Sequence, residues 1–444
     1  MKLYSTNNTT TLFSLREAVL KGLPDDNGLF VPLDIPMLPP SFFEEFSGFS
    51  FSELAFEVAS SLIGDAIPEV ELMRIVHGAI SFPAPLVELS PECNVLELFH
   101  GPTLAFKDFG ARFMSLMMSY FNQSEDKDLV ILVATSGDTG GAVASGFYNI
   151  PGIQVVILYP SGRVSHLQEK QLTTLGGNIH AIEVNGSFDD CQAMVKTAFL
   201  DKPLNKQIRL SSANSINIAR LIPQSFYYFE AYKQLENKER PVVFSVPSGN
   251  FGNITAGLLA KKMGLPVHQF LAATNLNDIV PQFLESGIYA PKASVATISN
   301  AMDVGNPSNF YRMLSLYMEQ VEPVTIKSST WNHMKKDISG FAYTDDQTRE
   351  AIAEIKAKYD YIMDPHGAVG YLALKDYQAS FPDSTGIILE TAHPSKFVDE
   401  VESTLNTKVN IPERLARLAD LKKEASQMDF EYDQLKGYLL DRFK

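Results

Sequence analysis

One stretch organises this chain: Phe99-His100-Gly101-Pro102-Thr103-Leu104-Ala105-Phe106-Lys107-Asp108-Phe109-Gly110. It places Lys107 in an apolar setting, with Leu104, Ala105 and Phe106 before it and Phe109 after it. Burial disfavours the charged ammonium, so such a lysine titrates nearer neutrality and becomes nucleophilic toward aldehydes. The alternative is a surface lysine whose stem lies along apolar atoms while its ammonium reaches water. Three loops later in the chain bear on this choice.

A helix is predicted directly after Lys107. The apolar residues Phe109, Phe113, Met117 and Phe121 fall on one helical stripe, which is typical of a helix packed against a core. Asp108 stands just before this stripe, and we expect it to cap the helix.

Length, composition and net charge limit which functions the chain can have. With 444 residues, 45% hydrophobic and 20% charged, the chain is long enough for two domains and has an ordinary globular composition. A net charge of −15 argues against nucleic acid as the main partner. Two cysteines cannot form a disulfide framework, and no signal peptide or membrane span is evident. We expect a cytoplasmic protein that acts on a small molecule, with no membrane and no obligate protein partner.

The fold class is predicted from alternating strands and helices. The apolar run 129–134 is typical of a strand buried on both faces, and strands are also expected at 154–159, 179–184, 242–246, 268–273 and 387–390. Helices are expected at 12–20, 52–63, 68–80, 187–200, 214–235 (kinked at Pro223), 254–263 and 396–405. We therefore predict an α/β protein with two open, twisted, mainly parallel sheets flanked by helices.

Three regions are expected along the chain. Residues 1–95 form a mixed α/β N-terminal extension. Residues 96–210 form a smaller α/β domain with Lys107 and the 135–141 loop. Residues 211–444 form a larger α/β domain that ends in a charged helical tail.

Loops that follow parallel strands carry the polar side chains. Ligands in such sheets bind beyond the carboxyl ends of the strands, and helix N-termini favour anions. The 247–253 loop is the best phosphate candidate, because Gly249 and Gly252 let backbone amides approach an anion while Asn250 and Asn253 add polar groups. A tight turn that uses glycine for its geometry is the alternative. The loop is not G-x-G-x-x-G, and the chain holds no G-x-x-x-x-G-K-[ST] motif, which weakens a nucleotide interpretation.

Three further groups offer anion contacts. The hydroxyls of Ser136 and Thr139 and the amide of Gly137 suit a carboxylate, and the alternative is a capped helix start. Thr391, in the 391–395 loop, reads on its own as part of a helix cap. Arg220 follows Asn214 and Ser215 into a helix and suits a phosphate, and the alternative is a surface salt bridge.

The histidines predict no metal site, since the eight residues show no ligand spacing. A reactive lysine and a phosphate loop together suit pyridoxal phosphate. The 135–141 loop, which suits a carboxylate, further indicates an amino-acid substrate. The Arg220 cluster indicates that this substrate also carries a phosphate.

The residues just described resemble a known family. The run 97–109 resembles the lysine motif of the threonine synthase family, a branch of the fold-type II pyridoxal-phosphate enzymes. Further similar segments are 4–6, 27–30, 134–140, 214–217, 247–252, 300–304 and 391–394. The resemblance spans residues 4 to 405 in order. One position departs from many fold-type II relatives: this chain has Asp138 where they carry Asn, so a neutral amide contact to the cofactor's phenolic oxygen is not assumed.

The resemblance implies an activity: O-phospho-L-homoserine and water become L-threonine and phosphate. It implies that Lys107 forms a Schiff base with pyridoxal phosphate, later acts as the base, and that Thr391 hydrogen-bonds the pyridine nitrogen. The residues it implies for the cofactor phosphate are Gly249, Asn250, Phe251 and Asn253. The residues it implies for the substrate are Ser136, Gly137 and Thr139 at the carboxylate and Asn214, Ser215 and Arg220 at the phosphate, with Asn217 as a further candidate.

Two alternatives stay open at this point. Another fold-type II lyase, such as a serine or threonine dehydratase, shares the lysine and the cofactor but binds a substrate without phosphate. A non-enzymatic nucleotide-binding module would use the two glycine loops and no Schiff base. Release of phosphate from O-phosphohomoserine would exclude the dehydratase alternative. A visible absorbance band that is lost in Lys107→Ala would exclude the nucleotide-binding module.

Overall fold

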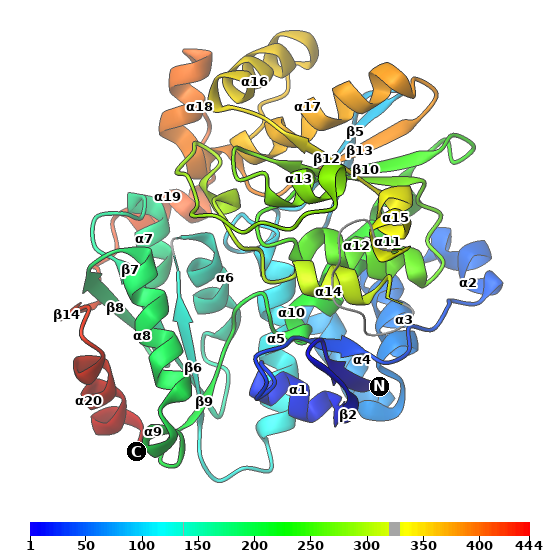
Figure 1. Cartoon of the computed structure of the whole chain (residues 1–444). Helices are drawn as coiled ribbons and strands as arrows, with labels where there is room; N and C mark the ends of the chain where they lie inside the picture. Colours follow the sequence, from blue (N-terminus) through cyan, green and yellow to red (C-terminus); the bar gives the residue numbers. More distant parts are fainter. Residues whose placement is uncertain (136, 319–328) are drawn as a thin grey trace.

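Two open sheets form the scaffold of the computed structural model, which describes residues 1–135, 137–318 and 329–444 (Figure 1). The larger sheet has the strand order β12-β11-β10-β13-β5-β4 and is parallel except for the β4–β5 pair. Its strands are β4 (Leu86–Ser90), β5 (Cys93–Glu97), β10 (Val242–Pro247), β11 (Gln269–Thr274), β12 (Ile338–Ala342) and β13 (Thr385–Glu390).

The smaller sheet is parallel throughout, with the order β14-β8-β7-β6-β9. Its strands are β6 (Leu129–Ala134), β7 (Ile153–Pro160), β8 (Ile179–Asn185), β9 (Arg209–Ser211) and β14 (Ser426–Asp429). The predicted fold class of two mainly parallel sheets is therefore confirmed.

Strand β6 shows why an unbroken apolar run forms a doubly covered strand. Leu129, Ile131 and Val133 pack into the core that also holds the apolar faces of α5 (Lys107–Asn122) and α6 (Asp138–Phe147). Val130 and Leu132 point to the opposite face, into a second core with α8 (Phe188–Leu200) and α20 (Tyr432–Phe443). Side chains alternate between faces along a strand, so both faces need apolar residues when both are covered. The predicted stripe of Phe109, Phe113, Met117 and Phe121 on α5 is buried, as expected.

The larger sheet is covered in the same way. On one face lie α16 (Asp345–Tyr359) and α17 (Pro365–Ser380), whose apolar residues share a core with β10, β11 and β13. On the other face lie α11 (Phe226–Gln234) and α12 (Gly252–Lys262), packed through the large core that continues under the smaller sheet. Figure 1 shows α5 and α10 (Ile218–Leu221) between the two sheets.

The N-terminal part forms its own antiparallel sheet, with the order β2-β1-β3. It contains β1 (Lys2–Ser5), β2 (Asn8–Ser14), β3 (Phe30–Pro32), α1 (Leu15–Lys21), α2 (Pro40–Glu45), α3 (Phe51–Ile63) and α4 (Glu69–Ala79). The helix expected at 12–20 begins only at Leu15. Ser14 caps it in a capping box with Glu17, and the residues before Ser14 pair as a strand.

The helix expected at 214–235 is broken into three pieces. Asn217 accepts from the N–H of Ala219 and starts α10, so residues 214–216 lie outside the helix. A 3₁₀ turn, η3 (Ile222–Ser225), carries Pro223 at the predicted kink and leads into α11. This break leaves Asn214 and Ser215 in a loop at the edge of the scaffold.

The remaining helices connect these layers. They are α7 (His166–Thr173), α9 (Lys202–Asn205), α13 (Ile279–Ser286), α14 (Phe310–Ser315), α15 (Ser329–Asp337), α18 (Val398–Leu405) and α19 (Glu413–Ala419). Short 3₁₀ turns are η1 (Phe46–Gly48), η2 (Gly64–Ala66), η4 (Asn300–Met302) and η5 (Pro394–Phe397). In the ranges that the structure describes, every helix is too short or too polar to cross a bilayer.

Sheet membership cuts across the expected regions at two places. β4 and most of β5 precede residue 96, yet both belong to the larger sheet. The tail, expected to be helical, contains α19 and α20 but also β14, which adds an edge strand to the smaller sheet and lies beside it in Figure 1. The chain thus returns to the smaller sheet after completing the larger one. The division at 1–95, 96–210 and 211–444 stays a proposal.

Candidate active site

The loops after β6, β10 and β13 line one cavity of about 680 Å³, as their positions after parallel strands predict. The sequence-predicted residues that line it are Lys107, Thr139, Asn214, Ser215, Arg220, Gly249, Asn250, Phe251, Asn253 and Thr391. Ser136 lies outside the described residues, and Gly137 is not among the lining residues. The cavity therefore brings together predicted residues that are up to 284 positions apart in the chain (391 − 107).

Lys107 lines this cavity, and backbone pairing holds its position. It is the first residue of α5, and the N–H of Phe106 donates to the carbonyl of Thr391 at 2.9 Å. Its side chain is 14% exposed, and its Nζ lies 5.4 Å from the centroid of the Phe106 ring. Burial lowers the pKa of Lys107, which favours the neutral, nucleophilic amine. The surface-lysine alternative is therefore wrong.

Asp108 does not cap the helix, contrary to the prediction. Phe106 occupies the cap position, and Asp108 lies inside the first turn, where its carboxylate accepts from the N–H of Thr103 at 2.8 Å and from its hydroxyl at 2.7 Å. Burial raises the pKa of Asp108 to about 6. Gly101 packs so tightly on it that a Cβ would lie 2.5 Å from Asp108 Oδ2. Asp108 therefore fixes the turn that delivers Lys107.

The 247–253 loop presents its backbone to the cavity. Phe251, at φ +59°, is the N-terminal cap of α12 and makes no side-chain capping bond. Among the described residues, no protein acceptor is hydrogen-bonded to the backbone N–H groups of residues 249–253. Two side-chain hydrogen bonds fix the shape of the loop. Asn253 Nδ2 donates to the carbonyl of Pro247 at 2.7 Å, and Asn250 Nδ2 donates to Ser215 Oγ at 2.6 Å. Unpaired amides at a helix N-terminus are suited to a phosphate.

The 135–141 loop is organised by Thr135. Its Oγ1 accepts from the N–H groups of Gly137 at 3.0 Å and Gly140 at 2.9 Å. The amide of Gly137 is thus already bonded. The residue must be glycine for another reason: φ is +149°, and a Cβ would lie 2.7 Å from Gln168 Nε2. Thr139, one residue into α6, lines the cavity and is better placed for a carboxylate than Gly137.

Arg220 brings a buried positive charge to the same cavity. It is 3% exposed, and its Nη1 donates to the carbonyl of Ala213 at 2.8 Å, while its Nε has no protein partner. Burial lowers the pKa of Arg220 to about 10, so the guanidinium stays charged at neutral pH. Within the described ranges, Arg220 forms no ion pair, which rules out the salt-bridge alternative there. Such a site favours an anionic ligand.

Two predicted residues remain, Thr391 and Asn217, and only Thr391 reaches the cavity. Thr391 lines it, and in the described part of the chain no protein group is hydrogen-bonded to its hydroxyl. Asn217 is fully buried elsewhere: its Nδ2 donates to the carbonyl of Val19 at 2.9 Å and its Oδ1 caps α10. We therefore withdraw Asn217 as a substrate contact.

Sequence reasoning missed a histidine at the cavity wall. His366 Nδ1 is hydrogen-bonded to Asp364, and its Nε2 accepts from the N–H of Ala301 at 3.2 Å. This pairing fixes the neutral tautomer that carries its proton on Nδ1. The signal available in the sequence was Asp364-Pro365, which is typical of a helix start; Asp364 indeed caps α17 through Gly367 N at 2.8 Å.

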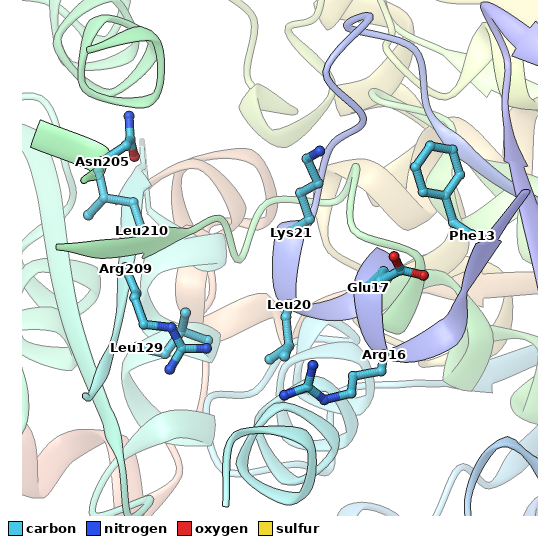
Figure 2. A pocket seen from close by; sticks show the side chains of 9 residues that line it. All are labelled: Phe13, Arg16, Glu17, Leu20, Lys21, Leu129, Asn205, Arg209 and Leu210. Carbon is cyan, nitrogen blue, oxygen red and sulfur yellow. The ribbon is translucent and has the colours of Figure 1, made fainter. Parts of the chain in front are cut away.

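A second crevice, of about 380 Å³, lies between α1 and β9 (Figure 2). Arg16 and Arg209 line it, and both of these guanidinium groups pair with Glu125, at 2.5 and 3.7 Å. The crevice offers no buried nucleophile. We assign the chemistry to the larger cavity.

The expectation of a metal-free site stays a prediction. In residues 1–135, 137–318 and 329–444, no group of three or more His, Cys, Asp or Glu side chains is arranged to hold an ion.

Family models match almost the whole chain. The model described as pyridoxal-phosphate dependent enzyme matches residues 83–390. The models described as threonine synthase N terminus and threonine synthase, C-terminal match residues 2–80 and 367–439.

Individual relatives agree with these matches. The chain is 45% identical over 442 residues to the threonine synthase of Escherichia coli (strain K12). The aligned region covers 99% of this chain and 100% of the Escherichia coli protein. The crystal structure of threonine synthase from Escherichia coli superposes with a TM-score of 0.90 at 44% identity, covering 99% and 100%. A pyridoxal-phosphate-bound threonine synthase from Brucella melitensis superposes with a TM-score of 0.93 at 35% identity, covering all of both chains.

The fold thus agrees with the sequence matches: this chain belongs to the threonine synthase family of pyridoxal-phosphate-dependent enzymes.

Proposed function

We propose that this chain converts O-phospho-L-homoserine and water into L-threonine and phosphate, with pyridoxal phosphate as cofactor. One observation supports this most: a buried lysine lines the same cavity as a charged arginine that forms no ion pair in the described part of the chain. The lysine suits the cofactor aldehyde. The arginine gives a second anion site, which a substrate that carries both a carboxylate and a phosphate needs.

The residues present fit the cofactor. The unbonded N–H groups of residues 249–253 would hold its phosphate, with Gly249, Asn250, Phe251 and Asn253 contributing chiefly through their backbones. Lys107 would form the covalent bond to its aldehyde, and the hydroxyl of Thr391 would face the ring nitrogen. Once bound, pyridoxal phosphate supplies an electron sink for the electron pair left at the substrate Cα.

The substrate would be bound at both its carboxylate and its phosphate. Thr139, near the N-terminus of α6, would bind the carboxylate; Ser136 and Gly137 stay predicted contributors there. Arg220, with Asn214 and Ser215, would bind the phosphate. Ser215 Oγ already accepts from Asn250, so its own hydrogen is available to donate to a phosphate oxygen. The guanidinium of Arg220 would stabilise the negative charge that develops when the Cγ–O bond breaks.

Lys107 would also move the protons. With the substrate bound, the free amine of Lys107 would take the Cα proton. A second proton leaves Cβ, phosphate leaves Cγ, and a proton is added at Cγ. Water would then add its hydroxyl to Cβ while its remaining proton passes to the base, and a proton returned to Cα would complete L-threonine. Burial lowers the pKa of Lys107 and so favours the neutral, basic amine that these transfers need.

A direct assay tests this proposal. The purified chain is incubated with O-phospho-L-homoserine, and phosphate and threonine are measured together. We expect equal amounts of both, and a visible absorbance band that is absent in Lys107→Ala. Release of ammonia from threonine without phosphate release would support the dehydratase alternative instead.

Location and partners are also proposed. We propose that the enzyme acts in the cytoplasm on a small molecule and without nucleic acid, membrane or an obligate protein partner. The net charge of −15 and the two unpaired, buried cysteines, Cys93 and Cys191, support this.

A further inference from the structure

Two lysines share one buried carboxylate beside the cavity. Asp138 Oδ1 lies 2.6 Å from Lys396 Nζ, while Asp138 Oδ2 lies 3.6 Å from Lys107 Nζ. The side chains of Asp138 and Lys396 are 5% and 1% exposed. The motifs discussed above assign no role to Lys396, which lies in η5, just after the Thr391 loop.

Lys396 is the better-held partner of this carboxylate. Its Nζ also donates to the carbonyl of Thr103 at 2.9 Å, so it is bonded to both a carboxylate and a carbonyl at hydrogen-bond distance. Gln168 Nε2 donates to the same Asp138 oxygen at 2.9 Å. Lys107, at 3.6 Å, is beyond a good hydrogen bond. Asp138 therefore has its charge neutralised mainly by Lys396.

Charge balance in this buried cluster decides which lysine loses its proton. Burial by itself raises the pKa of Asp138, but Lys396 and Lys107 outweigh it and hold that pKa well below its ordinary value. Burial lowers the pKa of Lys107; Asp138 opposes this, and the positive charges of Lys396 and Arg220 add to it. Asp138 lies 2.6 Å from Lys396 Nζ and 3.6 Å from Lys107 Nζ, so a positive charge on Lys396 is the one placed to balance this carboxylate.

We infer that Lys396 is a positioning residue that neutralises Asp138 and so leaves Lys107 as the uncharged amine that reacts with an aldehyde. Lys396 is not among the cavity-lining residues and acts through Asp138. This inference rests on the proposed role of Lys107. It explains how a lysine stays reactive with a carboxylate 3.6 Å away, which would otherwise draw a proton onto it.

The test measures the amine of Lys107 directly in the full-length chain freed of cofactor. The protein is labelled with a small amine-acylating reagent across a pH series, and the Lys107 peptide is quantified by mass spectrometry. In Lys396→Met, Asp138 keeps its charge and pairs with Lys107, so we expect the labelling midpoint to rise by one pH unit or more. Below the midpoint, one unit corresponds to a tenfold loss of reactive amine and of the rate of covalent capture of pyridoxal phosphate.

Three variants separate this effect from general damage. Lys396→Arg keeps the charge and should keep the midpoint near that of the unaltered chain. The double variant Lys396→Met/Asp138→Asn removes both charges and should restore it. Lys233→Met is the matched control, since Lys233 is 12% exposed, pairs with Glu230 at 2.7 Å and donates to the carbonyl of Phe49, away from the cavity.

The outcomes are distinct. An unchanged midpoint in folded Lys396→Met, or an equal rise in Lys233→Met, overturns the inference. If Lys396→Met does not fold, the double variant decides: a midpoint near that of the unaltered chain supports the inference, and a shift of one unit or more overturns it. If the midpoint moves as expected but the unaltered chain gains no visible absorbance with pyridoxal phosphate, the proposed function fails while the charge arrangement stands.

Discussion

Gly249 offers the sharpest test of the phosphate loop. A Cβ built on Gly249 would lie 2.7 Å from the carbonyl oxygen of Ala301 and 2.8 Å from Met302 Cα. Both are backbone atoms, so no side-chain rotation can relieve the clash. Restoring an ordinary contact of 3.4 Å requires a displacement of about 0.7 Å (3.4 − 2.7) between the phosphate loop and η4. Gly249→Ala should therefore push the loop amides out of position.

The size of the effect follows from the cost of overpacking. Forcing an extra methyl group into a close-packed site costs about 1–3 kcal/mol. If that cost falls on the cofactor-binding conformation, pyridoxal phosphate should bind about 5- to 150-fold more weakly, since 1.4 kcal/mol corresponds to a factor of ten. Titration of the cofactor-free protein, followed by the visible absorbance band, measures this directly.

Gly437, inside α20 and outside the cavity lining, supplies the control. A Cβ there would meet nothing within 4 Å. Gly437→Ala should therefore change cofactor affinity less than twofold, and alanine is the better helix residue at this position. Equal losses in the two variants, or none in Gly249→Ala, would refute the assignment of this loop.

Three further predictions concern single side chains. Arg220→Ala should raise KM for O-phosphohomoserine about 10- to 150-fold, because a charge-assisted hydrogen bond contributes about 1.5–3 kcal/mol, while cofactor affinity changes little; equal loss of both in paired titrations contradicts the phosphate role. Thr391→Val should lower kcat up to about tenfold with cofactor still bound, the value of one neutral hydrogen bond, as steady-state assays at saturating cofactor would show. Burial, with Asp364 adding to it, raises the pKa of Glu390 well above its ordinary 4.5, so the folded state binds this proton more tightly than the unfolded state. Its stabilisation is complete below about pH 4.5 and is lost as pH rises, so Glu390→Gln should gain Tm relative to the unaltered chain between pH 4.5 and 8; a constant difference in Tm would contradict this.

Much of the fold could be predicted because local patterns coincide with tertiary ones. The run 129–134 is apolar on every residue since both faces of β6 are covered, and that pattern is visible without coordinates. The four-residue strand β14 could not be found this way. Ser426–Asp429 has no apolar run, and only its pairing with β8 makes it a strand.

The candidate site likewise has features that the sequence predicted and features that it did not. The position of the cavity followed from sequence, because parallel strands place their carboxyl ends at one edge and their loops must converge there. Asn217 looked like its neighbours in sequence, yet its side chain caps α10 and bonds Val19 instead of facing the cavity.

The sequence by itself determined the α/β class and identified Lys107 and the three loops that line its cavity, because each depends on residues adjacent in the chain. Only the tertiary structure decided how charge is distributed among them. Lys396 and Asp138 lie 258 positions apart (396 − 138), and no local pattern pairs them. Their contact arises because η5 follows β13 of one sheet and α6 follows β6 of the other. The packing of the two sheets, rather than local propensity, therefore sets which lysine lies against Asp138.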